Sequence, residues 1–343
     1  MNLLSKIIAV FVLTSILLIS ACRKHNEDDK PDSSIELAYP SYFPDPHYRS
    51  LNNPLSKEGI ELGRKLFYDP ILSIDSSISC GTCHSQAHAF SGHNTAFSLG
   101  VNNKKGSRNS PALFNLAWNT SFMADGGINH IEVMPVAPIT NPVEMGETVS
   151  RVIEKLQRSL TYTILFERAF GPGKINDQKM LYAMSQFMST IVSADSRYDQ
   201  FVQGRLTFTV DEKQGLLLFR TYCESCHKEP LFTDYSFRNN GIDSIFKDRG
   251  RELITLDIND RGKFKVPSLR NIAYTYPYMH DGRYYTLENV LDQYRAVKPS
   301  HSLDPTLKKK ILLSDMEKKQ IIAFLKTLTD NTYLSNRNYS EPK

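Results

Sequence analysis

Four of the five cysteines fall in two pentapeptides of one form, CGTCH at 80–84 and CESCH at 223–227. In the pattern Cys-x-x-Cys-His, both thiols can attach to the vinyl groups of a haem, and the next His can ligate its iron. Disulfides, zinc and thioredoxin-like chemistry are the competing interpretations. Zinc does not require a His after each Cys pair, and a thioredoxin-like motif needs an α/β pattern that this chain lacks. The sequence therefore predicts two covalent haem c groups, attached at Cys80, Cys83, Cys223 and Cys226, with His84 and His227 as proximal ligands.

The remaining apolar residues follow a mainly helical pattern. Helical spacing precedes each pentapeptide and recurs elsewhere, at 57–67, 148–169, 177–193, 212–219, 286–294 and 314–329. Strand patterns are scarce, and loops fill 91–145 and 228–285. A chain of 343 residues, 41% of them hydrophobic, can bury two cores. We expect a loop-rich, mainly α protein whose two cytochrome c-like domains each carry one haem c, with domains at 41–198 and 199–335 and a tail at 336–343.

The N-terminus has the pattern of an export signal. Residues 1–21 combine Lys6 with an apolar run that is too short to span a membrane. The sequence ISAC at 19–22 resembles a bacterial lipobox, so we expect cleavage before Cys22 and lipid on Cys22. An ordinary signal peptide with an incidental Cys is the alternative. Residues 22–40 are predicted to be a flexible tether, which gives an exported lipoprotein facing the periplasm or cell surface of a Gram-negative bacterium.

Further sequence blocks resemble one family from Pro54 to Thr329. The blocks are GSRNSPAL at 106–113, NPVEM at 141–145, KVPSLRN at 265–271 and TYPYMHDG at 275–282. Together with the two pentapeptides, they resemble the bacterial di-haem cytochrome c peroxidases and their MauG-like relatives. The resemblance implies a peroxide-reacting haem in the first half, above His84. It also implies an electron-relay haem in the second half, above His227.

The resemblance also implies roles for single residues. Glu144, in the NPVEM block, matches the catalytic acid of the family; without that match it would be taken for a solvated loop carboxylate. A calcium ion commonly lies between the two haems of the family. Its protein ligands map to the Asn109 side chain and to the carbonyl groups of Thr275 and Pro277, and oxygen donors of this kind suit a hard cation.

The distal ligand of the second haem iron is open between two residues. Tyr294 stands where the peroxidases carry Met and the MauG-like enzymes carry Tyr. Met279 is close in sequence, and its softer thioether is the rival ligand. We favour Tyr294, although plain packing would also explain it. A phenolate would lower the reduction potential of the iron relative to a thioether.

Three positions depart from the family pattern. Val101 stands at the position where many family members have a distal His, which leaves the iron on activation. Without that His, we expect the first iron to be open to peroxide without prior reduction. Ala124 replaces the Trp usually found between the haems, and Met134 replaces a distal Gln. His88 and His93 lie in the same loop as Val101 and could still ligate the iron, although each is more simply a surface or supporting His. The only tryptophan of the chain, Trp118, lies six residues before Ala124.

These features predict an enzyme that reduces hydrogen peroxide with electrons from a small carrier such as a cytochrome c or a cupredoxin. One alternative is a MauG-like oxidase of a protein or small organic substrate. A second is a lipid-anchored di-haem electron carrier without enzyme activity. The net charge of +4 is too small and scattered to indicate nucleic acid. A homodimer is compatible with the resemblance.

Overall fold

The computed structural model describes residues 34–49, 51–309 and 311–343. The signal segment and the proposed lipidation site Cys22 lie outside these residues. The α-helices are α2 (Lys57–Tyr68), α3 (Cys80–Cys83), α4 (Val136–Thr140), α5 (Val149–Gln157), α6 (Leu160–Phe170), α7 (Asp177–Thr190), α8 (Arg197–Val202), α9 (Val210–Tyr222), α10 (Glu252–Thr255), α11 (Leu287–Arg295), α12 (Asp315–Lys326) and α13 (Asn331–Ser335). The short strands β1 (Phe237–Arg238) and β2 (Phe264–Lys265) pair antiparallel. A mainly helical fold with little sheet confirms the expected fold class.

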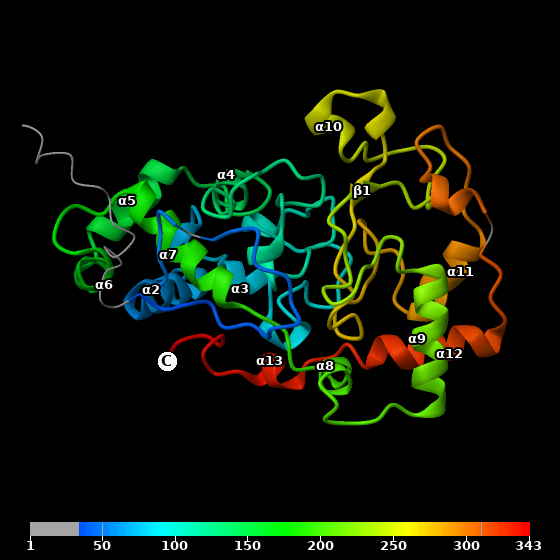
Figure 1. The fold of residues 1–343 in the computed structure, drawn as a ribbon. Coiled ribbons are helices and arrows are strands. Elements are labelled where there is room, and N and C mark those ends of the chain that lie inside the picture. The colour runs from blue at the N-terminus through cyan, green and yellow to red at the C-terminus, as the bar shows by residue number, and fades with distance from the viewer. Residues whose placement is uncertain (1–33, 50, 310) are drawn as a thin grey trace, which may run out of the picture.

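The first half is built on a close pair of helices, α2 and α7 (Figure 1). Ser56 begins α2 by accepting a hydrogen bond from the Gly59 backbone N–H. Gly63 faces the carbonyl oxygen of Ala183, and any side chain at Gly63 would overlap it. This approach buries Leu62, Leu66 and Phe187 completely. The first Cys-x-x-Cys-His turn packs against this helix pair through α2.

The second half repeats this arrangement with α9 and α12. A side chain at Gly215 would overlap the carbonyl oxygen of Gln320, just as a side chain at Gly63 would overlap that of Ala183. Ser314 and Glu317 form a capping box at the start of α12, within the predicted helical stretch 314–329. The apolar residues of that stretch are buried: Ile321, Ile322, Phe324, Leu325 and Leu328. Each half thus has a close helix pair, and the first helix of the pair, α2 or α9, leads into the pentapeptide.

The periodic stretch at 148–169 is two helices. Ser159 separates α5 from α6, and its hydroxyl accepts a hydrogen bond from the Tyr162 backbone N–H. The apolar spacing continues across the break, so periodicity alone does not show it. The two helices then cover the end of the first half that lies far from the second half (Figure 1).

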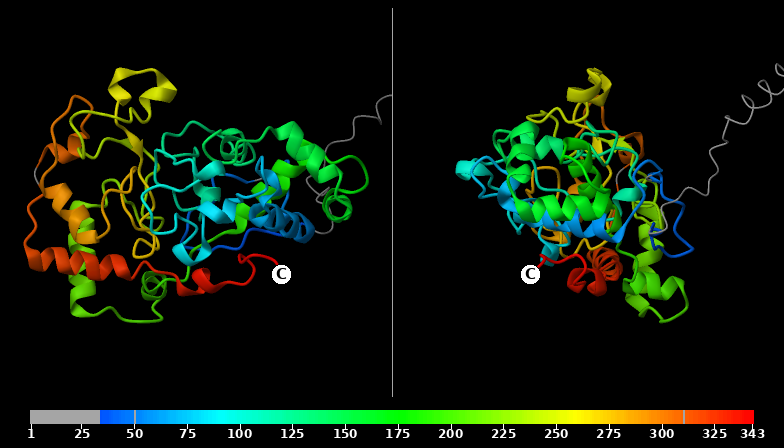
Figure 2. Two further views of the ribbon diagram at one scale, coloured as in Figure 1. Left: turned by 180° about the vertical axis from the view of Figure 1, so that it is seen from behind. Right: turned by 90° about the vertical axis from the view of Figure 1, so that its left-hand side faces the viewer.

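The two halves lie side by side and meet through buried polar groups (Figures 1 and 2). Asp330 accepts hydrogen bonds from the backbone N–H groups of Ala194 and Asp195, at 2.8 and 3.0 Å. The Asn271 side chain donates to Ser193 Oγ and accepts from the Asp330 backbone N–H. The connection after α7 is therefore tied to the segment after α12.

The C-terminal segment returns to the first half. Tyr333, on α13, is buried in the first core against Phe90 and Phe114. Tyr68 donates a hydrogen bond to the Tyr339 carbonyl at 2.7 Å. The division into domains at 198/199 stays a prediction, with α13 packed on the core of 41–198. Within the described residues, no helix combines the length and apolar character needed to cross a bilayer.

Candidate functional site

The first pentapeptide forms a single helical turn, α3, followed by His84. Ser79 and Thr82 cap this turn reciprocally through side-chain and backbone hydrogen bonds. Cys80 and Cys83, three positions apart, lie on one face of the turn, and both are half-buried free thiols. This is the spacing and exposure that two thioether bonds to one haem require.

The His84 ring is oriented by a backbone carbonyl. Its Nδ1 lies 3.0 Å from the carbonyl oxygen of Phe90. Because a carbonyl can only accept, Nδ1 carries the proton and Nε2 is free to ligate a metal. Burial lowers the pKa of His84 to about 4, which keeps the ring neutral near pH 7. Position, tautomer and charge all suit a proximal haem ligand.

His227 repeats the same arrangement in the second half. Its Nδ1 lies 3.2 Å from the Phe232 carbonyl oxygen and 3.1 Å from that of Pro267. Burial lowers the pKa of His227 as well. Cys223 and Cys226 are half-buried free thiols beside it. The residues of both pentapeptides therefore fit covalent haem c by donor chemistry, tautomer and exposure.

Glu144 lies in the loop after α4, next to the first attachment turn. Its Oε1 accepts a hydrogen bond from Asn141 Nδ2 at 2.7 Å. Burial raises the pKa of Glu144, while the Asn141 hydrogen bond opposes that rise. Burial raises the pKa of the thiols of Cys80 and Cys83, and the Glu144 charge adds to that rise. The carboxyl group is therefore close to the place where the first haem attaches.

The loop that contains Val101 is fitted against Glu144. The Val101 backbone N–H donates to the Glu144 carbonyl at 2.8 Å. A side chain at Gly100 would overlap the carbonyl oxygens of Val143 and Glu144, so only glycine allows this approach. Val101 is 2% exposed and offers no donor atom for iron. The position that holds a removable His in other family members is a buried aliphatic residue here.

His88 and His93 pair with each other. Their ring centroids are 5.4 Å apart, and burial lowers the pKa of His88. The charge of His93 also lowers the pKa of His84, which places His93 near the first attachment turn. A role for either ring as an iron ligand stays a prediction.

Ala124 lies where the two halves meet, beside a lysine that sequence reasoning missed. The Lys265 backbone N–H donates to the Ala124 carbonyl at 2.8 Å, and Lys265 Nζ donates to the Ser121 carbonyl at 2.6 Å. Burial lowers the pKa of Lys265 to about 8, against the opposing charge of Asp125. No sequence signal marks a lone Lys as buried. A cationic side chain thus stands beside the position where the family carries an aromatic ring.

Trp118 does not replace that ring. It packs edge-on against Tyr39 and Phe43, with ring centroids 5.4 Å away in both cases. Its Nε1–H donates to the Pro44 carbonyl at 2.7 Å. Trp118 belongs to a small separate core. Met134, the other departure, is buried in the first core and has no hydrogen-bond donor.

The structure brings Tyr294 and Met279 together around Asn240. Asn240 Nδ2 donates to the Met279 sulfur at 3.4 Å. Burial raises the pKa of Tyr294 to about 12, the thiols of Cys223 and Cys226 add to the rise, and a hydrogen bond from Asn240 opposes it. Both candidate ligands are therefore near the second attachment turn. Asn240 is a second residue that the sequence did not indicate.

The candidate calcium ligands lie on two segments that contact each other. The Asn109 backbone N–H donates to the His280 carbonyl at 2.8 Å, next to the segment of Thr275 and Pro277. Asn109 Nδ2 donates to the carbonyl groups of Thr95 and Ala96, both at 3.2 Å, which leaves Oδ1 for a cation. In the described part of the chain, no three His, Cys, Asp or Glu side chains gather as a metal site.

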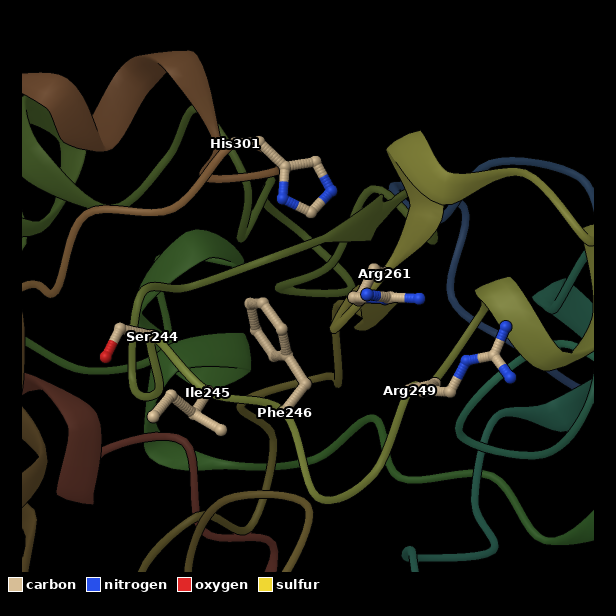
Figure 3. A pocket seen from close by; sticks show the side chains of 6 residues that line it. All are labelled: Ser244, Ile245, Phe246, Arg249, Arg261 and His301. Atoms are coloured by element: carbon tan, nitrogen blue, oxygen red, sulfur yellow. The ribbon is translucent and has the colours of Figure 1, made fainter.

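One surface cavity is remote from these residues. It has a volume of about 480 Å³, lies on the outer face of the second half, and is open to solvent. Figure 3 shows the side chains that line it: Ser244, Ile245, Phe246, Arg249, Arg261 and His301. Arg249 and Arg261 both pair with Glu252, so one carboxylate is shared by two cationic side chains. None of the candidate haem, calcium or acid–base residues lines this cavity.

Known proteins share both the fold and the motifs. The family described as di-haem cytochrome c peroxidase matches residues 57–207. The methylamine utilization protein MauG of Methylorubrum extorquens is 36% identical over 82% of this chain and 81% of its own length. The cytochrome c551 peroxidase of Nitrosomonas europaea is 32% identical, over 80% of this chain and 81% of its own. The crystal structure of a MauG-like protein associated with microbial copper homeostasis superposes with a TM-score of 0.84 at 31% identity, covering 90% of this chain and 99% of that one.

A helical fold with two Cys-x-x-Cys-His turns defines a di-haem protein of the cytochrome c type. The chain belongs to the di-haem cytochrome c peroxidase family, which includes MauG. The predicted family is therefore confirmed, and so is the prediction of a haem-dependent peroxidase, an oxidoreductase. The alternative of a carrier without enzyme activity is disfavoured.

Proposed function

We propose that the chain reduces hydrogen peroxide to water with electrons from a small periplasmic carrier, such as a cytochrome c or a cupredoxin. One peroxide takes up two electrons and two protons and gives two waters. Haem c groups, held by the turns at 80–84 and 223–227, supply the redox chemistry when bound. The observation that carries the proposal is the half-buried Glu144 carboxyl group, held by Asn141 close to the first turn.

Glu144 moves the proton. As a base it takes the proton from one peroxide oxygen, and as an acid it returns a proton to the oxygen that leaves as water. A carboxyl group with a raised pKa suits both directions near neutral pH. Asn141 fixes the carboxyl orientation through its 2.7 Å hydrogen bond. A positioned acid–base group of this kind contributes roughly 10²–10⁴-fold to the rate.

Glu144 has an ionisable side chain, whereas Val101 and Met134 have side chains that cannot transfer protons. Val101 is aliphatic and buried, so this loop supplies no side-chain ligand that peroxide would have to displace. Met134 cannot donate a hydrogen bond. We therefore expect reactivity toward peroxide without prior reduction.

The test is replacement of Glu144 by Gln, with Glu154→Gln as the control. Glu154 is an exposed carboxylate of α5, 4.0 Å from Arg158, and stands outside the proposed site. Glu144→Gln is expected to lower peroxide turnover at least about a hundredfold while both haems remain attached. Glu154→Gln is expected to turn over like the wild type. Unchanged turnover in Glu144→Gln would remove Glu144 from the mechanism.

A MauG-like oxidation of an organic or protein substrate is the second candidate. The observations that favour it are the nearness of Tyr294 to the thiols of Cys223 and Cys226, and Ala124 in place of the inter-haem Trp. Sustained turnover of peroxide with a reduced small carrier supports the peroxidase. Peroxide-dependent oxidation of an added phenol or indole with no carrier turnover supports the second candidate.

The remaining proposals concern cofactor, location and assembly. Calcium at Asn109, Thr275 and Pro277 is supported by the free Asn109 Oδ1 and by the contact with His280. Export and lipid attachment at Cys22 are supported by the sequence of residues 1–22. Metabolic labelling with a fatty acid, with Cys22→Ser as control, tests the anchor. Light scattering of the haem-loaded protein tests the homodimer.

A further inference from the structure

Asn240 is a polar side chain that contacts Met279, one of the two candidate ligands of the second haem. It lies in the turn after β1, and its Oδ1 accepts a hydrogen bond from the Ile242 backbone N–H at 3.2 Å. This bond fixes which end of the amide is the acceptor. The opposite end, Nδ2, donates to the Met279 sulfur at 3.4 Å. The thioether is therefore held by a donor with a defined orientation.

The same turn is attached to the helix that carries Tyr294. Gln293, which is buried on α11, donates from Nε2 to the Gly241 carbonyl at 3.0 Å. Its Oε1 accepts from the Tyr284 hydroxyl at 3.1 Å. Since Tyr294 follows Gln293 directly, these bonds hold the helix segment that carries Tyr294 against the turn that carries Asn240.

The backbone of Met279 does not mark it as an iron ligand. Met279 has a left-handed backbone, with φ 74°, in a turn closed by the pairing of Tyr278 with Tyr284. The first half has the same turn. Met123 has φ 66° there, and the pairing of Phe122 with Ile128 closes the turn. The left-handed conformation is therefore a repeated feature of the fold. It gives no preference for iron at Met279.

The Asn240 amide acts on the thioether. A hydrogen bond to the thioether uses a sulfur lone pair and weakens the sulfur as a donor to iron. Ferric iron also prefers an anionic oxygen donor, such as the Tyr294 phenolate, to a thioether. We propose that Asn240 is a positioning residue that assigns the distal site of the second haem iron to Tyr294 by restraining Met279. This inference rests on the proposed haem at His227 and adds the residue that selects its ligand.

The experiment compares ferric absorption and electron paramagnetic resonance spectra, and the midpoint potential of the second haem, in the full haem-loaded chain. The variants are Asn240→Ala, Asn240→Asp, Met279→Leu and the double variant Asn240→Ala/Met279→Leu. Asn240→Asp keeps the acceptor for the Ile242 N–H and removes the donor, so it covers the case in which Asn240→Ala fails to fold. Haem content and circular dichroism check that each variant is intact.

Wild type and Met279→Leu are expected to show a phenolate-ligated haem with the same midpoint potential. Asn240→Ala and Asn240→Asp should gain the far-red charge-transfer band of thioether ligation and a higher midpoint potential. The double variant should lose that band. A thioether band in the wild type, or spectra unchanged in both Asn240 variants, would overturn the inference. The spectra need neither peroxide nor carrier, so failed turnover would count against the proposed function and not against this assignment.

Discussion

Replacing Asp199 by Asn would leave the Arg270 guanidinium buried without its counter-charge. Both side chains are completely buried, and they are joined by two hydrogen bonds of 2.8 and 2.9 Å. Asp199 also accepts from the Tyr42 hydroxyl at 2.7 Å. Arg270 in turn donates to the Pro230 carbonyl and stacks over Phe232, whose own carbonyl orients His227. The ion pair thus supports the second haem site.

The expected magnitude follows from burial. Removing one partner of a buried ion pair costs about 3–5 kcal/mol, because the remaining charge cannot be solvated. An exposed pair contributes about 0–1 kcal/mol. Asp195 and Arg205 form such a pair at 2.6 Å, with side chains 43% and 49% exposed. Asp195→Asn is therefore the matched control for Asp199→Asn, since it removes the same charge from the same type of pair.

Thermal unfolding of the haem-loaded protein measures the difference. At about 2–4 °C per kcal/mol, Asp199→Asn should lower the Tm by roughly 6–20 °C, and Asp195→Asn by roughly 0–4 °C. Burial alone would raise the pKa of Asp199, but Arg270 lowers it below the ordinary value. The stability from this pair is therefore present above the ordinary Asp pKa and is lost as the pH falls through the lowered one. Equal Tm losses in the two variants would refute the reasoning.

Three further predictions concern titration and the cation. Because burial raises the pKa of Glu144, the acid limb of kcat/KM for peroxide should lie above that of an ordinary carboxyl group, and Asn141→Ala should raise it further; an unmoved limb in the pH profile contradicts this. Burial lowers the pKa of Lys265 from 10.5 to about 8, so burying the charged amine costs stability below pH 8, and the protein should become more stable as the pH rises from 8 to 10.5. Lys265→Met should remove this rise in the free energy of unfolding, measured by denaturant titration. A pH dependence equal to that of the wild type contradicts the prediction. A calcium chelator should lower turnover in the wild type but change little in Asn109→Ala, whose activity is already low; equal losses in both proteins count against the site.

Local chemistry is the part of this molecule that its sequence reveals. The spacing of Cys80, Cys83 and His84 carries its own meaning, because all three groups must reach one haem. The box of Ser314 and Glu317 predicts the start of α12, because capping involves only neighbouring residues. The helices α2 and α9 could be anticipated from apolar spacing, since each buries one face.

Long-range burial is the part that the sequence does not reveal. Lys265 and Asn240 are ordinary polar residues in loops, and their roles come from neighbours far along the chain, Ser121 for one and Met279 for the other. The return of Tyr333 to the first core is of the same kind, because nothing near Tyr333 specifies its partner Phe90.

The central claim is that the first haem iron has an accessible distal side next to the Glu144 carboxyl group. The most direct measurement is electron paramagnetic resonance of the fully oxidised, haem-loaded protein, before any reduction, with and without added cyanide. We predict a high-spin ferric signal from one haem of the two that becomes low-spin when cyanide binds. Two low-spin haems that ignore cyanide, both before reduction and after a cycle of reduction and reoxidation, would contradict the account.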